Sequence, residues 1–303
     1  MDKKELITYL DKIKDLRVLV VGETIIDEYQ YGYTLGKAGK FPIVAFQNEK
    51  LEIYDGGIIA ICNHLSDFCK VDYITDIEPI VKKRYVQNSQ KLFETYSKET
   101  PHYYSIFTIL DDCNNINYWD CNYEDYDLVI VADFGHGFIT KEMRKKILQE
   151  SNYIALNTQF NAGNLGMNTI NKYEYADYIC IDEHELRLAT SNQYGNIEDI
   201  IKNRFTEQIV SITLSSKGTV IYKNNEIQFF DALEHHPVDT VGAGDAYFAI
   251  TSPLAYLDAP LDVIGYVGNV VGAIACSYQG NKESITKEKL ISKIKEIKKN
   301  DER

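Results

Sequence analysis

The stretch Val238-Asp239-Thr240-Val241-Gly242-Ala243-Gly244-Asp245 forms a glycine-rich segment that ends in a carboxylate. The apolar run 246–252 follows it and predicts a helix that stops before Pro253. Glycine lets the backbone approach a ligand closely, and the free amides at a helix start attract an anion. A carboxylate beside an anion is unfavourable unless it accepts a proton there. We therefore predict that Asp245 is the general base of a phosphoryl transfer, with a helix-capping acid as the alternative.

Outward from this stretch, strand and helix patterns alternate along the chain. Residues 17–22 form a short apolar run that ends in glycine, which is typical of a buried parallel strand. Residues 29–53 and 79–97 alternate aromatic and polar side chains and indicate strands of a small β-layer. The sequence predicts an α/β fold with a doubly wound, mainly parallel sheet and a small projecting β-lid, in a single domain over 1–303. We expect helix and loop over 103–123.

The bulk composition limits the classes of function. The chain has 303 residues, 45% of them hydrophobic, and a net charge of −13, which disfavours partners such as nucleic acid or an anionic membrane. Its six cysteines contain no C-x-x-C pair, which indicates reduced thiols rather than a zinc site. We find no secretory signal and no run long enough to span a bilayer. These features predict a cytoplasmic protein without a nucleic-acid or membrane partner.

Several polar residues lie where a parallel sheet binds its ligands, at the carboxyl ends of its strands. Glu23 and Asp27 follow the first strand, and a solvated loop is the alternative for both. Gly56-Gly57 precedes a helix and offers either exposed amides or a tight turn. Lys82 and Arg84 share one face of a strand. They could bind a phosphate or simply protect a charged edge strand from aggregation.

The chain resembles the ribokinase-like (PfkB) family of carbohydrate kinases over nearly its whole length. Residues 239–245 are similar to the family signature D-T-x-G-A-G-D, whose amides form an anion hole and whose last aspartate is the base. Asp182-x-x-Glu185 is similar to the N-x-x-E motif, which organises Mg²⁺, with aspartate in place of asparagine. The resemblance implies ATP and Mg²⁺ as cofactors and leaves a need for K⁺ open. It implies a catalytic set of Gly242, Ala243, Gly244 and Asp245 and a nucleotide site of Thr213, Lys217, Gly218, Thr240 and Asn269.

Within that family the chain is most similar to heptose-phosphate kinases. Lys82-Lys83-Arg84 and Asp133-Phe134-Gly135-His136-Gly137 resemble the K-x-R and D-Y-G-K-G motifs of this subgroup. The resemblance implies phosphorylation of the anomeric hydroxyl of a heptose 7-phosphate, for bacterial surface-polysaccharide precursors. It implies a substrate site of Glu23, Asp27, Gly56, Gly57, Lys82, Arg84 and Asp133.

Two departures on the substrate side leave the sugar open. Ala60 stands where asparagine is usual, and His136 replaces a lysine. Another sugar or a nucleoside (ribose, fructose or adenosine type) remains an alternative, as does a non-catalytic regulator that binds sugar or nucleotide on the same fold. The exposed edge of the lid could pair with a second subunit to form a homodimer.

Overall fold

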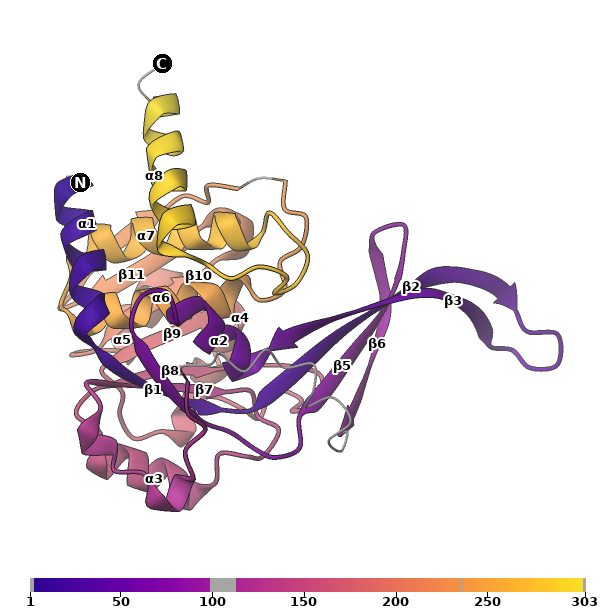
Figure 1. The fold of residues 1–303 in the computed structure, drawn as a ribbon, viewed down its shortest axis with the longest axis horizontal. Coiled ribbons are helices and arrows are strands. Elements are labelled where there is room, and N and C mark those ends of the chain that lie inside the picture. Colours follow the sequence, from indigo (N-terminus) through magenta and orange to yellow (C-terminus); the bar gives the residue numbers. More distant parts are fainter. Residues whose placement is uncertain (1–2, 99–112, 235, 302–303) are drawn as a thin grey trace.

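The computed structural model describes residues 3–98, 113–234 and 236–301, and an eight-stranded sheet forms its centre (Figure 1). Its strands are β1 (Arg17–Gly22), β4 (Lys70–Ile74), β7 (Leu128–Asp133), β8 (Ile154–Thr158), β9 (Tyr178–Asp182), β10 (Ile209–Thr213), β11 (Thr219–Lys223) and β12 (Glu226–Phe230). They follow the order β12-β11-β10-β9-β8-β7-β1-β4. The first six strands named are parallel to one another, whereas β11 and β12 are antiparallel to their neighbours. The predicted doubly wound sheet is confirmed.

Helices cover both faces of this sheet because alternate side chains of each buried strand point to opposite faces. Val18 and Val20 pack with one set of helices, and Leu19 and Val21 pack with the other. The first set comprises α1 (Lys3–Lys12), α2 (Gly57–Leu65), α6 (Ala243–Tyr256), α7 (Leu261–Ala275) and α8 (Lys287–Asp301). The second comprises α3 (Lys141–Glu150), α4 (Glu183–Thr190) and α5 (Ile197–Arg204). Two apolar cores therefore fix the sheet from both sides.

A four-stranded sheet projects from the central body as a long arm (Figure 1). It contains β2 (Thr24–Lys37), β3 (Val44–Gly56), β5 (Ile80–Gln87) and β6 (Gln90–Lys98), in the order β3-β2-β5-β6. Only Glu23 separates β1 from β2, so the chain passes from the core into this arm without a loop. Asp27 consequently lies on a strand and not in the solvated loop that was its alternative. Most of the segments 29–53 and 79–97 falls on these four strands.

One sequence-based expectation differs from the structure, and another falls partly outside the described residues. Helix α6 does not stop before Pro253 but continues to Tyr256. Proline removes one hydrogen bond from a helix interior, but α6 is buried from Ala246 to Ala255, and this packing outweighs the loss. Of the segment 103–123, residues 103–112 lie outside the described part, and 3₁₀ turns occur at Tyr118–Asp120 and Tyr123–Asp125. Among the described residues, no helix is long and apolar enough to cross a bilayer.

Candidate active site

A cavity of about 870 Å³ opens where the strand ends, the start of α6 and the projecting sheet meet. Asn157, Asp182 and Thr213 line it from the carboxyl ends of β8, β9 and β10. Lys82 reaches it from β5, and Asp245 from the first turn of α6. Ligands of doubly wound sheets bind at this edge, so the cavity is the candidate site.

The start of α6 presents backbone amides to the cavity. Gly242 caps the helix with a φ of 81°, and a side chain there would collide with Asn281. Only glycine meets both demands easily. A side chain at Gly244 would instead enter space that is open among the described residues. The Ala243 amide makes only a long hydrogen bond to the Thr240 carbonyl (3.3 Å), and the amides of a first helical turn lack intrahelical acceptors, so residues 242–244 can receive an anion.

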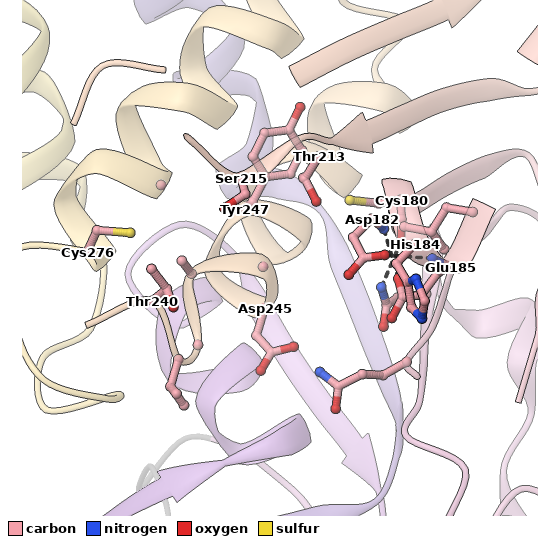
Figure 2. A pocket seen from close by; sticks show the side chains of 18 of the residues that line it. Cys180, Asp182, His184, Glu185, Thr213, Ser215, Thr240, Asp245, Tyr247 and Cys276 are labelled. Atoms are coloured by element: carbon pink, nitrogen blue, oxygen red, sulfur yellow. Dashed lines mark hydrogen bonds between the residues drawn. The ribbon is translucent and has the colours of Figure 1, made fainter. Parts of the chain in front are cut away.

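Asp245 projects its carboxylate into this cavity, on the side opposite Asp182 and Glu185 (Figure 2). Burial raises the pKa of Asp245 to about 7; the charge of Asp27 adds to the rise and the charge of Lys82 opposes it. No hydrogen bond to this carboxylate occurs among the described residues. A half-ionised carboxylate near neutral pH is well matched to accept a proton from a hydroxyl.

The projecting sheet contributes two cations and two acids to the same end of the cavity. Arg84 donates a hydrogen bond to the buried Asp27, and its Nε lies 3.5 Å from Glu94 Oε2. The Nζ atom of Lys82 lies 3.5 Å from Gln159 Oε1. Burial lowers the pKa of Lys82, and the charge of Asp27 opposes this effect. Lys82 and Arg84 do share one face, as alternation predicts, but both face carboxylates there.

Asp182 and Glu185 form a capping box at the start of α4. The amide of Glu185 donates to Asp182 Oδ1 (2.7 Å), and the amide of Asp182 donates to Glu185 Oε2 (2.8 Å). The other Glu185 oxygen accepts the amide of Phe160 (2.8 Å). Burial, followed by the charge of Asp182, raises the pKa of Glu185 to about 8. One oxygen of Asp182 has no hydrogen bond among the described residues, so this residue could contact a cation directly.

The pair fits a weakly held, hydrated Mg²⁺ better than a fully protein-bound metal. Mg²⁺ typically keeps several waters and binds one or two carboxylates together with substrate phosphates. Over the described ranges, no three His, Cys, Asp or Glu side chains gather into a metal site. A K⁺ requirement stays a prediction.

The cavity is also lined by four residues that were predicted to bind the nucleotide, namely Thr213, Gly218, Thr240 and Asn269. Gly218 has a φ of 95°, and a side chain there would collide with the carbonyl of Phe230. Asn269 donates to the carbonyls of Phe230 (3.2 Å) and Asp231 (3.1 Å) and accepts from Thr219 (2.8 Å). Asn269 thus fixes the loop after β12 that forms this wall of the cavity.

Similarity to known proteins identifies the family of this chain. The family model for pfkB family carbohydrate kinase matches residues 103–288, more than half of the chain. The chain belongs to the pfkB family of carbohydrate kinases. The resemblance predicted from residues 239–245 and from the other motifs is therefore confirmed.

Individual relatives of this pfkB family kinase are distant. The bifunctional protein HldE of a Nitratiruptor species is 24% identical over 267 residues, which is 77% of this chain and 55% of that protein. The bifunctional protein HldE of Syntrophotalea carbinolica is 21% identical over 288 residues, 82% of this chain and 57% of that protein. The chain thus spans about half the length of these curated relatives.

Solved structures confirm the ribokinase-like fold of this kinase. Ribokinase of Thermotoga maritima has a TM-score of 0.67 at 14% identity, over 92% of this chain and 99% of that one. The nucleoside kinase of Methanocaldococcus jannaschii has a TM-score of 0.67 at 15% identity, over 93% and 99%. Ribokinase of Arabidopsis thaliana, solved with ribose and ATP, has a TM-score of 0.66 at 13% identity, over 93% and 99%.

Two residues predicted to bind substrate support the cavity of this kinase from outside its wall. Glu23 accepts the amides of Phe134 (3.0 Å) and His136 (3.1 Å), so it holds the turn after β7. Burial raises the pKa of Glu23, and the charge of Asp133 adds to this rise. Asp133 is bound by three partners, namely the Tyr173 hydroxyl, the Lys172 ammonium and the Gly135 amide. Neither acid lines the cavity, so their role as substrate ligands stays a prediction.

Gly57 lines the cavity, with a φ of 58°, whereas Gly56 and Lys217 do not. A side chain at Gly56 would collide with Asp27, so this glycine lets β3 pass close to that carboxylate. Lys217 lies in the 3₁₀ turn Ser215–Lys217, next to the wall but not in it. A binding role for Gly56 and Lys217 stays a prediction.

Sequence reasoning did not assign a role to Asn157, Gln159 and Asn161, which also line the cavity. Gln159 lies beside Lys82. Asn157 donates to the carbonyl of Cys180 (2.7 Å), and Asn161 to the carbonyl of Phe134 (2.6 Å). These amides alternate at and just after the end of the buried strand β8, and that pattern could have marked them.

Proposed function

We propose that this kinase transfers the γ-phosphoryl group of ATP to a sugar hydroxyl with Asp245 as the general base. The position of Asp245 carries the proposal: its desolvated carboxylate lies in the same helical turn as the amides that would receive the phosphoryl group. Asp245 takes the hydroxyl proton as a new bond forms to phosphorus. The bond from the γ-phosphorus to its bridging oxygen breaks, and ADP leaves.

The surrounding residues have separate tasks in this scheme. The amides of 242–244 stabilise charge on the transferred group, and Asp27 binds hydroxyls of the acceptor. Asp182 and Glu185 would hold Mg²⁺, which neutralises phosphate charge. The projecting sheet keeps water from the cavity and so limits hydrolysis of ATP.

The direct test is ADP release with ATP, Mg²⁺ and a panel of sugars, sugar phosphates and nucleosides. We expect release to depend on one acceptor and to fall about 10²-fold or more in Asp245→Asn. Parental turnover in that variant would rule out Asp245 as the base. If no acceptor stimulated ADP release while ATP still bound, the protein would be a binder of sugar or nucleotide instead of an enzyme.

For the acceptor, we propose the anomeric hydroxyl of a heptose 7-phosphate, as used for bacterial surface-polysaccharide precursors. The similarity of Lys82 and Arg84 to the K-x-R motif and their place in the cavity support it, together with the two HldE relatives. A neutral sugar or nucleoside is the second candidate. The ion pairs of Arg84 with Asp27 and Glu94 favour it, because they leave this end of the cavity without net positive charge.

Charge-removing variants separate the two acceptors. For a sugar phosphate, Arg84→Ala should raise KM sharply, and Glu94→Gln should lower it because one repelling carboxylate is gone. For a neutral acceptor, Glu94→Gln should leave KM nearly unchanged. If each variant changed KM equally for phosphorylated and for neutral acceptors, this end of the cavity would not recognise the phosphate of the sugar.

We also propose a cytoplasmic homodimer that pairs through the projecting sheet. The six cysteines are free thiols, which fits a reducing compartment. Large apolar side chains are exposed on this sheet and its hairpin: Tyr33, Leu35, Phe41, Ile43, Val44, Leu51, Leu92 and Phe93. Such a patch is typical of an interface. Sedimentation should give a dimer for the parent and a monomer for Ile43→Glu, and a monomeric parent would exclude the pairing.

A further inference from the structure

Asp239, the first acid of the glycine-rich stretch, is bound by three separate parts of the molecule. Its Oδ1 accepts the amides of Thr240 (2.7 Å) and Val241 (3.1 Å), which lead into α6. The same oxygen accepts the ammonium of Lys91 (2.6 Å) from β6. Its Oδ2 accepts the hydroxyl of Tyr29 (2.8 Å) from β2 and the amide of Gly280 (3.3 Å). These five donors saturate a buried carboxylate.

A β-bulge brings Lys91 to this carboxylate. The β5–β6 register pairs Tyr85 with Phe93 and then Val86 with Lys91, so Leu92 is an extra, unpaired residue. Without the bulge, Leu92 would share the face of Val86, and Lys91 would point to the opposite face. With the bulge, Lys91 lies on the same face as Arg84 and Lys82. The strand thus directs Lys91, whose side chain is still 38% exposed, to the buried carboxylate of Asp239.

The Lys91–Asp239 pair links the acceptor side to the proposed anion hole. Arg84, which donates to Asp27, and Lys91 each lie over the ring of Tyr29, at 5.6 and 5.7 Å from its centre. The hydroxyl of the same tyrosine donates to Asp239. A chain of contacts therefore connects Asp27, which faces the acceptor, to Asp239 in the loop before α6. Movement of the projecting sheet would act directly on that loop.

Asp239 has an electrostatic need for the ammonium. Its side chain is 5% exposed, and an unpaired carboxylate at such a place is costly. Burial alone would raise the pKa of Asp239, but the hydrogen bonds from Lys91, Tyr29 and Val241 hold it below its ordinary value. The loop that carries residues 240–244 folds around this ionised group through the amides of Thr240 and Val241.

We propose that Lys91 is a positioning residue for phosphoryl transfer. It holds Asp239 and thereby sets the amides of 242–244 only while the projecting sheet covers the cavity. The inference rests on the proposed role of these amides as the anion hole. It adds that the hole is assembled by a lysine from the projecting sheet, so that closure and transition-state stabilisation are one event.

The test compares Lys91→Met, which removes the charge at similar length, with Lys91→Arg, which keeps it. Lys50→Met is the matched control, because Lys50 makes a surface ion pair with Glu52 at 2.5 Å on the same sheet. Hydrogen exchange of the amides 240–244 is measured in the full chain, together with kcat and KM for ATP. In Lys91→Met we expect exchange to rise about tenfold. We expect kcat to fall about 10- to 100-fold, with KM for ATP changed by less than about twofold. Lys91→Arg and Lys50→Met should stay near the parent.

Two further readouts distinguish positioning from simple loss of stability. Lys91→Ala leaves room for a small cation, so methylammonium should restore part of its kcat and leave the parent unchanged. The double variant Lys91→Met with Asp239→Asn should have a kcat no lower than that of the more impaired single variant, because both substitutions break the same ion pair.

Unchanged exchange in Lys91→Met, or faster exchange with parental kcat, would overturn the inference. A double variant whose kcat loss is the product of the two single losses would overturn it as well. Failure of the proposed function shows differently, as parental turnover in Asp245→Asn or as no acceptor-dependent ADP release. The exchange measurement still decides whether Lys91 holds the loop.

Discussion

Replacing Asp245 by asparagine should stabilise the folded protein above neutral pH while it removes most of the turnover. The folded state raises the pKa of this carboxyl from 3.8 to about 7, so its ionised form is disfavoured by folding. Below about pH 3.8 the group is neutral in both states and costs nothing. As pH rises the cost grows, and it is complete above about pH 7. Asparagine has nearly the same shape and carries no charge at any pH.

The size of the effect follows from the pKa shift. About three pKa units correspond to at most about 4 kcal/mol of unfolding free energy. Asp245 is partly open to the cavity, and asparagine also loses the attraction to Lys82, so we expect a net gain of about 1–2 kcal/mol at pH 8. For a chain of this size that is a rise of several degrees in Tm. The gain should shrink towards pH 5.

Denaturation by urea at pH 5, 6, 7 and 8, without ligands, measures this difference. Asp239→Asn is the matched control with the opposite sign, because the pKa of Asp239 is lowered in the folded state and its ionised form stabilises the protein. That variant should be less stable than the parent at pH 8. If Asp245→Asn were less stable than the parent at pH 8, or if its gain did not depend on pH, Asp245 would not be a desolvated base.

Three further outcomes are expected. The kcat of the parent should rise with pH around a midpoint near 7, as ionisation of Asp245 requires, and a flat profile from pH 6 to 8 would contradict this role. Gly242→Ala should lower the unfolding free energy by about 1–3 kcal/mol and reduce kcat, because φ is 81° and the new methyl group meets Asn281; calorimetry and kinetics check both. His64, whose pKa burial lowers to about 4, stabilises the fold when neutral, so stability should be lost as pH falls from about 6.5 towards 4. His64→Gln should flatten that part of the urea profile, and an unchanged slope would exclude His64 as its source.

The core of the fold could be predicted from sequence because its signal is local. A parallel strand covered on both faces is a continuous apolar run, and 128–132 shows this plainly. The site at the start of α6 could be predicted for the same reason, since glycines and acid are neighbours in sequence. The passage from β1 to β2 could not, because the single residue Glu23 replaces the loop that separates most strands. Asp27 therefore lies on a strand and not in the loop that was its alternative.

Residues that hold other parts of the protein in place were harder to predict than residues that face the cavity. Glu23 and Asp133 lie at strand ends, where ligand-binding acids often lie, but both are bound by nearby donors that sequence does not reveal. Lys91 and Asp239 are 148 residues apart, and their contact depends on one extra residue in β6. Sequence periodicity gives the face of a side chain only while the register is unbroken, so a bulge hides the contact.

The glycine-rich stretch itself shows why residue type alone cannot assign a role. Asp239 and Asp245 lie six positions apart and are chemically identical, but their environments move their pKa values in opposite directions. Asp239 accepts five hydrogen bonds, one of them from an ammonium, and is held ionised. Asp245 accepts none among the described residues and is left to desolvation. One acid is therefore fixed as a charge that shapes the loop, while the other stays free to exchange a proton near neutral pH. The projecting sheet contributes to this difference, because Tyr29 and Lys91 donate hydrogen bonds to Asp239, whereas no described residue of the sheet donates one to Asp245.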